Sequence, residues 1–289
     1  MSAEGSIAPP DTGGTQERGR TPFLLVTGGK GGVGKTTLTA NLAIELARIG
    51  VAPIAVDLDF GLADLSVVLG LSPAVTIEDL MAGRAGLEDS LCEGPAGVRI
   101  LPAGSEARDA GRDAALRAHL FETLEGAGAG LFVGDSPAGI GPDVLDYAAH
   151  AGRGGRVLLV TTPDPAALTD AYSVLKAIDA DARARGVEIP TPDVFVNLAA
   201  DAAQARDVAG RLRSVSERFL CRAPRLLGWM PRSRAALAAS ARQEAFVLAD
   251  PACLATRAVR QLAKRFSDLA RPVAPRAVAS GAGSGGGAR

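Results

Sequence analysis

The sequence predicts an α/β protein with one doubly wound, mostly parallel β-sheet flanked by helices. Short, nearly continuous apolar runs recur along the chain, as expected for parallel strands buried on both faces. Helical patterns lie between these runs, which is typical of repeated βαβ units in a single sheet. A glycine-rich turn joins the first apolar run to the first helical pattern, and such turns often bind phosphate.

Seven apolar runs are predicted strands, and five stretches are predicted helices. The strands cover residues 23–27, 53–59, 98–102, 131–135, 157–162, 193–198 and 225–230. The helices cover Lys35–Ile49, Arg108–Leu124, Thr169–Arg185, Asp201–Phe219 and Arg234–Val247. These elements predict one domain over residues 22–270. Residues 1–21 and 271–289 are rich in small residues and proline without an apolar period, which predicts a disordered arm and a disordered tail.

Composition narrows the class of protein. The chain has 289 residues, 47% of them hydrophobic and 22% charged, as in soluble globular proteins. No apolar run approaches the roughly 20 residues that span a bilayer, and the N-terminus lacks a signal-peptide pattern. The three cysteines are far apart, which argues against disulfides or a zinc site and favours a cytoplasmic location. His119 and His150 are expected in exposed or capping positions.

The glycine-rich turn fits the phosphate-loop pattern Gly-x-x-x-x-Gly-Lys-Ser/Thr, with a strand before it and an amphipathic helix after it. Glycines let backbone N–H groups converge on phosphate oxygens, and the helix N-terminus adds partial positive charge. Lys35 is expected to neutralise the terminal phosphates of ATP, and the Thr36 hydroxyl to bind Mg²⁺. The residues expected to bind ATP or ADP here are Gly29, Lys30, Gly31, Gly32, Val33, Gly34, Lys35, Thr36 and Thr37.

Polar residues also follow the predicted strands. Asp57 and Asp59 end the second run, and residues two apart at a strand end point to the same side. Asp135 ends another run, and Asn197 lies near the end of a third. The asparagine amide offers both a donor and an acceptor to a ligand. Strand-end capping is the lesser alternative for the two aspartates, whereas the residue type alone fits Asn197 equally well as a turn asparagine.

The stretch "KGGVGKT" resembles the deviant Walker A motif of the MinD/ParA family of P-loop NTPases, which belongs to the SIMIBI class. This resemblance implies that Lys30 reaches across a dimer interface to the phosphates of the partner's ATP. Without it, Lys30 reads equally well as a solvated loop lysine. The resemblance further implies that Asp59 orients the attacking water, while Asp57 and Asp135 support Mg²⁺. In "DSPAGI" the amide of Gly139 would sense the γ-phosphate.

The resemblance also implies that Asn197 reads the adenine and that the loop Met230–Ser233 borders the base. It covers residues 22–267, and stretches such as "DFGLADLSVVLGL" and "TTPDPAALTDAYSVLKAI" resemble the FlhG group of flagellar-number regulators. That group implies an ATP-dependent homodimer with slow, partner-stimulated hydrolysis. It implies a signal-recognition-type GTPase (FlhF) and flagellar basal-body proteins as partners, and transient contact with the inner membrane or the cell pole. The arm lacks the group's Asp-Gln-Ala motif, and Asp64 replaces the usual asparagine.

Two features of the C-terminal part leave alternatives open. Val259, Leu262, Phe266 and Leu269 form an apolar stripe that is expected to pack on the sheet rather than lie on a membrane. Residues 201–271 carry 14 basic and 6 acidic residues, a net +8 that would suit non-specific DNA binding by a ParA-like cargo positioner. Solvated helix-face arginines explain the same excess. A metabolic kinase would need an acceptor site, and the sequence shows no second catalytic set.

Overall fold

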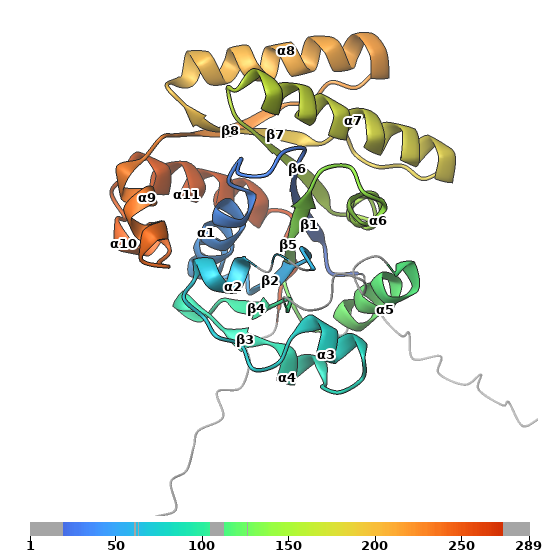
Figure 1. Cartoon of the computed structure of the whole chain (residues 1–289), viewed down its shortest axis with the longest axis vertical. Helices are drawn as coiled ribbons and strands as arrows, with labels where there is room; N and C mark the ends of the chain where they lie inside the picture. The colour runs from blue at the N-terminus through green and yellow to red at the C-terminus, as the bar shows by residue number, and fades with distance from the viewer. Residues whose placement is uncertain (1–19, 61, 63, 105–112, 126, 274–289) are drawn as a thin grey trace, which may run out of the picture.

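An eight-stranded sheet forms the centre of the protein, as described by a computed structural model over residues 20–60, 62, 64–104, 113–125 and 127–273 (Figure 1). The strand order is β3-β4-β2-β5-β1-β6-β7-β8, and every neighbouring pair is parallel except β3 with β4. This confirms the predicted fold class. The strands are β1 (Phe23–Gly28), β2 (Pro53–Asp57), β3 (Cys92–Glu93), β4 (Arg99–Leu101), β5 (Leu131–Ala138), β6 (Arg156–Thr161), β7 (Asp193–Ala199) and β8 (Leu226–Pro231).

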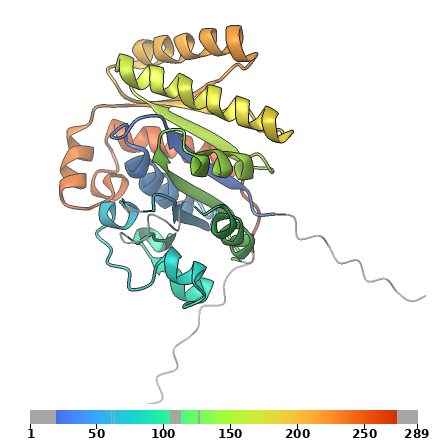
Figure 2. The same ribbon diagram turned by 45° about the vertical axis from the view of Figure 1, so that its right-hand side comes forward.

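Helices cover both faces of the sheet, so the apolar side chains form two cores. One core joins the sheet to α1, α2 and α9–α11, and the other joins it to α3 and α5–α8. Figure 2 shows α7 and α8 side by side at one end of the molecule. The helices are α1 (Lys35–Arg48), α2 (Leu65–Val68), α3 (Ile77–Met81), α4 (Leu87–Ser90), α5 (Ala114–Glu125), α6 (Pro142–Ala151), α7 (Pro165–Arg185), α8 (Ala202–Leu220), α9 (Arg234–Ala241), α10 (Phe246–Ala249) and α11 (Leu254–Ser267), with a 3₁₀ turn at Pro95–Gly97.

Some predicted element boundaries were wrong. The single helix expected over residues 234–247 is two helices, because Gln243 between them adopts a left-handed φ of 55°. The strand expected over residues 53–59 ends at Asp57, so Asp59 lies in the loop beyond it. The short antiparallel strand β3 and the helices α2–α4 were not predicted. The start of the helix expected over residues 108–124 lies partly outside the described residues, as do most of the arm and tail, whose disorder stays a prediction.

The C-terminal stripe packs against the protein, as expected. Val259, Leu262 and Phe266 on α11 are buried in the core shared with α1 and β8, and Leu269 packs against its edge. The stripe is therefore unavailable to a membrane surface. Among the described residues, no helix is both long and apolar enough to cross a bilayer.

The expected exposed or capping position of His150 was wrong. Its ring stacks on Phe121 at a centroid distance of 3.7 Å and meets Phe23 edge-on at 5.5 Å. Burial, with a smaller contribution from Arg153, lowers the pKa of His150 to about 4. The periodicity of α6 places this side chain against α5 and β1, so the ring is half-buried. His119 is exposed, as expected.

The strand order places the crevice of the sheet beside β1. β1 pairs with β5 on one side and β6 on the other, and the chain builds the sheet outward in both directions from there. In open α/β sheets, ligands bind beyond the carboxyl ends of the strands at such a point. The phosphate loop, Asp57, Asp135 and Asn197 all lie at or near carboxyl ends of strands in this sheet.

Candidate functional site

The phosphate loop connects β1 to α1 and is shaped by its glycines. Gly32 and Gly34 have φ angles of 78° and 93°, a region that other residues rarely adopt. A Cβ atom on Gly29 would lie 2.3 Å from the carbonyl oxygen of Asp170 in α7, so only glycine fits this approach. Lys35 begins α1 and is 8% exposed. The loop therefore offers backbone N–H groups, a helix N-terminus and one buried cation together, as a phosphate site requires.

The side-chain amide of Asn197 fastens β7 to the phosphate loop. Its Nδ2 donates to the carbonyl of Val33 at 2.8 Å, and its Oδ1 accepts from the backbone N–H of Leu198 at 2.8 Å. Asn197 is buried and lies directly against Gly34, where a Cβ atom would approach Nδ2 to 2.4 Å. In this arrangement the amide supports the loop that would hold phosphate. The predicted contact with adenine stays a prediction.

Two carboxylates lie side by side under the phosphate loop. Asp57 and Asp135 are register partners in β2 and β5, and both are buried. Thr39 donates its hydroxyl to Asp135 Oδ1 at 3.1 Å, and Thr36 also hydrogen-bonds to Asp135. Burial raises the pKa of Asp135 to about 6, opposed by the hydrogen bond from Thr36 and the charge of Lys35. Burial and then the charge of Asp135 raise the pKa of Asp57 well above its usual value.

This donor set fits a divalent cation. Mg²⁺ prefers hard oxygen ligands and keeps several waters, so one or two carboxylates with a hydroxyl suffice. Two buried carboxylates beside one lysine leave an excess of negative charge that a cation would offset. Thr36, Asp57 and Asp135 are therefore brought together as the sequence predicted, and their roles as ligands or as supports of the water shell stay predictions.

The two loops next to these carboxylates are held by hydrogen bonds. Asp57 accepts the N–H of Asp59 at 3.2 Å on one oxygen and the N–H of Leu65 at 3.1 Å on the other. Asp59 itself is half-buried and lies beyond the strand, so the two aspartates have different surroundings. On the other loop, the N–H of Gly139 donates to the carbonyl of Gly28 at 3.1 Å. A γ-phosphate sensed by Gly139 would have to replace this bond.

Lys30 makes an ion pair within its own chain. Its Nζ lies 2.7 Å from Asp164 Oδ2, with the two side chains 43% and 47% exposed. The hydrogen bond and the charge of Asp164 raise the pKa of Lys30, and the same contact lowers the pKa of Asp164. Asp164 also caps α7, because its other oxygen accepts the N–H of Ala166 at 3.1 Å. The helix start therefore fixes where this carboxylate meets the lysine.

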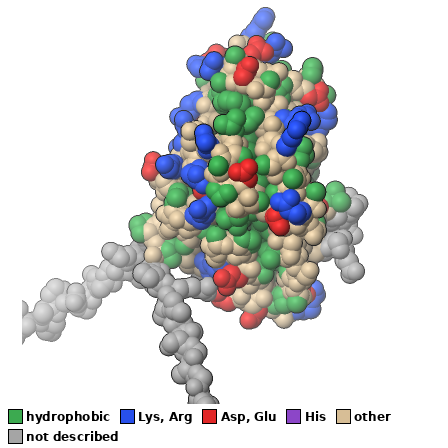
Figure 3. Space-filling view, turned by 90° about the vertical axis from the view of Figure 1, so that its left-hand side faces the viewer, with side chains coloured by type: hydrophobic (Ala, Val, Ile, Leu, Met, Phe, Trp, Pro, Cys, Tyr) green, Lys and Arg blue, Asp and Glu red, His purple; other side chains and the backbone are tan. Residues whose placement is uncertain are grey.

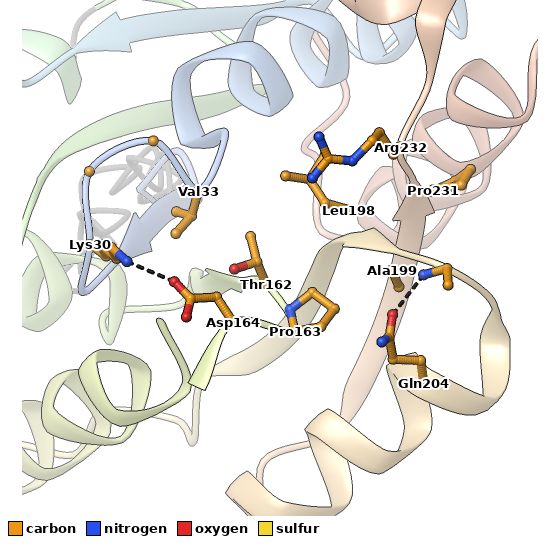
Figure 4. Close-up of a pocket in the computed structure, with 13 residues that line it drawn as sticks. Lys30, Val33, Thr162, Pro163, Asp164, Leu198, Ala199, Gln204, Pro231 and Arg232 are labelled. Carbon is orange, nitrogen blue, oxygen red and sulfur yellow. Dashed lines mark hydrogen bonds and ion pairs between the residues drawn. The ribbon is translucent and has the colours of Figure 1, made fainter. Parts of the chain in front are cut away.

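A cavity of about 660 Å³ opens beside the phosphate loop and runs toward β7 and β8 (Figure 4). The loop and the Lys30–Asp164 pair form one end, and the ends of β7 and β8 form the other. Between them lie apolar walls with a few polar groups. The lining residues are Lys30, Gly31, Gly32, Val33, Thr162, Pro163, Asp164, Leu198, Ala199, Ala200, Gln204, Pro231 and Arg232. The cavity includes Pro231 and Arg232 from the predicted base loop, whereas Met230 is buried in the core.

Sequence reasoning missed Asp164 and Gln204, whereas Arg232 falls within the predicted base loop Met230–Ser233. An aspartate before a proline is a recognisable helix start, so the capping role of Asp164 could have been predicted from "TPDP". Its pairing with Lys30 could not, because the two residues are 134 positions apart. Gln204 carries no motif, and only the strand order brings it to the cavity.

Comparisons with known proteins agree with this geometry. The family described as the CobQ/CobB/MinD/ParA nucleotide-binding domain matches residues 24–276. Antiactivator FleN of Pseudomonas aeruginosa is 34% identical over 256 residues, covering 88% of this chain and 89% of FleN. The flagellum site-determining protein YlxH of Helicobacter pylori is 36% identical over 55% of this chain and 54% of its own length.

A solved structure shares the architecture. The septum site-determining protein MinD of Pyrococcus horikoshii, complexed with Mg-ADP, superimposes with a TM-score of 0.68 at 26% identity, covering 86% of this chain and 96% of that one. The family match spans most of the chain, and the FleN alignment spans nearly all of both proteins. The chain therefore belongs to the CobQ/CobB/MinD/ParA nucleotide-binding family.

Proposed function

We propose that this protein is a molecular switch that binds ATP with Mg²⁺, dimerises and hydrolyses the ATP slowly. The observation that carries the proposal is the phosphate loop with Lys35 buried at the start of α1, above the carboxylates Asp57 and Asp135. Backbone N–H groups and Lys35 would bind the phosphates, and Thr36, Asp57 and Asp135 would hold Mg²⁺. Mg²⁺, when bound, neutralises charge on the phosphate oxygens.

Lys30, the other lysine of the phosphate loop, would make each nucleotide site depend on the dimer. We propose that the loop is a deviant Walker A motif and that Lys30 reaches the ATP of a second copy, as an arginine finger does. Lys30 is half-exposed at the rim of the cavity, and its present partner Asp164 is a surface carboxylate. A solvent-screened pair of this kind exchanges partners at little cost, so a γ-phosphate can compete for the ammonium group.

The loops that carry Asp59 and Gly139 would support hydrolysis and transmit the state of the nucleotide. Asp59 would position the attacking water, and a carboxylate is a weak base at neutral pH, so turnover would be slow until a partner stimulates it. Asp57 holds the loop that carries Asp59 in place by accepting the backbone N–H groups of Asp59 and Leu65. Gly139 would exchange its bond to Gly28 for the γ-phosphate. Both loops would thus change shape with the nucleotide.

The biological role that we propose is control of the number or placement of flagella. The support is the similarity to FleN along most of both chains and to a flagellum site-determining protein over about half of each. A flagellar GTPase of the signal-recognition type and basal-body proteins are the proposed partners. The proposed location is cytoplasmic, with transient contact at the membrane or pole made by something other than the α11 stripe, which is buried.

The second candidate is a ParA-like positioner that binds DNA, and the net +8 of residues 201–271 favours it. Six of the thirteen arginines in that segment are ion-paired with carboxylates: Arg211, Arg213, Arg222, Arg225, Arg242 and Arg260. On the face shown in Figure 3, basic side chains are spread among acidic and apolar ones. A DNA mobility shift at low salt with ATP tests this role, and no shift would remove it.

Mixing two inactive variants tests the switch. Lys30→Ala keeps its own nucleotide site but offers no lysine to a partner, whereas Lys35→Ala offers Lys30 but binds no nucleotide. Each variant alone should lack ATPase activity. In a mixed dimer, the ATP held by the Lys30→Ala chain meets Lys30 from the Lys35→Ala chain. The mixture should therefore recover a fraction of wild-type ATPase activity.

The double variant Lys30→Ala/Lys35→Ala is the matched control and should restore nothing when mixed with either single variant. Analytical ultracentrifugation of Asp59→Ala with ATP should show a stable dimer. No recovery in the mixture, or a monomeric Asp59→Ala chain with ATP, would contradict the proposal.

A further inference from the structure

Another cavity, of about 220 Å³, opens at the edge of the sheet opposite the phosphate loop. Arg156 begins β6, Asp193 begins β7 and Arg225 directly precedes β8, so all three lie at the amino ends of neighbouring parallel strands. Arg156 is the register partner of Leu24 in β1, four residues before Gly28. At about 3.3 Å per residue, this cavity lies roughly 13 Å along the strand from the start of the phosphate loop, so it is separate from the nucleotide site.

Three arginines from three different elements line this cavity: Arg156, Arg225 and, from α11, Arg265. Arg225 is already engaged, because its Nε and Nη2 lie 3.1 and 2.9 Å from Oδ1 of the buried Asp193. Arg156 and Arg265 are exposed, and neither forms an ion pair or a side-chain hydrogen bond with another described residue. Two guanidinium groups therefore remain available to a ligand.

The charge of the cavity suits a small anion. Its three guanidinium groups face two carboxylates, Asp193 and Asp268, which leaves a net charge of +1. Asp193 is held by Arg225, so Asp268, at the end of α11, is the carboxylate that would repel an anion. Asp268 is exposed, and water therefore weakens this repulsion. Leu227 and Phe266 contribute apolar wall, which strengthens the attraction to the arginines.

We propose that this cavity binds a phosphate monoester, free or carried by a lipid, between Arg156 and Arg265 with Arg225 beside it. A guanidinium group matches pairs of phosphate oxygens, and a phosphate monoester is largely dianionic at neutral pH, so it can satisfy two such groups at once. A carboxylate has two oxygens and one charge, so it would leave one arginine without a counter-charge. The site acts within one chain and does not depend on the proposed nucleotide binding.

Calorimetric titration with inorganic phosphate at low salt tests the site, using the Lys35→Ala chain so that the phosphate loop contributes little. Added to that chain, Arg156→Ala and Arg265→Ala should each weaken phosphate binding by about five- to tenfold, between the values for an exposed ion pair and a charge-assisted hydrogen bond. Asp268→Asn should tighten binding by about two- to fivefold, because it removes the repelling carboxylate. Arg257→Ala is the matched control: it is exposed on α11 and outside the cavity lining, so the affinity should not change.

Sedimentation with vesicles distinguishes a free phosphate from a lipid-borne one. Vesicles of phosphatidylcholine with phosphatidic acid present a phosphate monoester on a surface, and vesicles of phosphatidylcholine alone are the control. A lipid ligand predicts that the wild type sediments only with phosphatidic acid and that the double variant Arg156→Ala/Arg265→Ala does not. A soluble ligand predicts phosphate binding in calorimetry without sedimentation. The inference is overturned if neither probe is bound, or if the double variant holds every bound probe as tightly as the chain that keeps both arginines.

Discussion

Replacing Asp164 by asparagine should make the ATP-bound protein dimerise more tightly. In the monomer Lys30 is held 2.7 Å from Asp164, and it must leave this carboxylate to reach a second copy. Asparagine caps a helix about as well as aspartate does, so the bond to the Ala166 N–H and the start of α7 should survive. The variant removes only the charge that competes for Lys30.

The size of the effect follows from exposure and symmetry. Both side chains are nearly half-exposed, and exposed pairs typically change an equilibrium by about 1.4- to fivefold. A symmetric dimer releases two such pairs, so the dimerisation constant should rise by roughly two- to thirtyfold. Because salt screens exposed charges, the gain should shrink as ionic strength increases.

Sedimentation velocity of the Asp59→Ala chain, with and without Asp164→Asn, measures the dimerisation constant at saturating ATP. Asp113→Asn makes the same chemical change at the start of α5, where Asp113 accepts the N–H of Ala115 at 2.8 Å, and should leave dimerisation unchanged. An unchanged constant for Asp164→Asn at low salt, or a fall in it, would refute the idea that this pair opposes dimerisation.

Two other perturbations test the site and the core. Gly34→Ala should abolish ADP binding and lower the free energy of unfolding by more than the roughly 1–2 kcal/mol cost of a left-handed alanine, because the added Cβ would meet Asn197. Gly32→Ala is the control, since Gly32 has a similar φ but open space around it. Equal losses of stability in urea unfolding and of ADP affinity in calorimetry for the two variants would contradict this prediction. His150 has a pKa of about 4 in the folded protein, below the usual 6.5, so the unfolded state binds the proton more readily. The free energy of unfolding should therefore fall by up to about 3 kcal/mol as the pH drops from 6.5 to 4. His150→Phe should flatten this part of the stability profile, and an unchanged slope would refute the assignment.

Much of the fold was predictable because its strands are buried on both faces. Residues such as Leu24, Leu25 and Val26 form unbroken apolar runs, as expected of parallel strands buried between two layers of helices. The chain order of strands and helices then indicated the architecture. β3 was missed because two residues at an edge leave no pattern, and the break between α9 and α10 because nothing in the composition marks the turn at Gln243.

The candidate site also contains residues that the sequence predicts and residues that it does not. Lys35 and Thr36 were predictable because phosphate binding imposes a local spacing of glycines, lysine and threonine. Asp164 precedes α7 and Gln204 lies in α8, and their meeting at the cavity depends on strand order rather than on spacing. The hydrogen bond from Asn197 to the carbonyl of Val33 could not be predicted from the sequence either. The residue type indicates which kinds of group an amide can bind, but not which group it contacts in the fold.

A crystal structure of the Asp59→Ala protein with Mg-ATP would show whether Lys30 reaches the nucleotide of a second copy. We expect two copies face to face, with each Lys30 released from Asp164 and its Nζ about 2.7–3.2 Å from a phosphate oxygen of the nucleotide held by the other copy. An ATP-loaded chain in which Lys30 still contacts Asp164, or faces solvent with no second copy opposite, would contradict it.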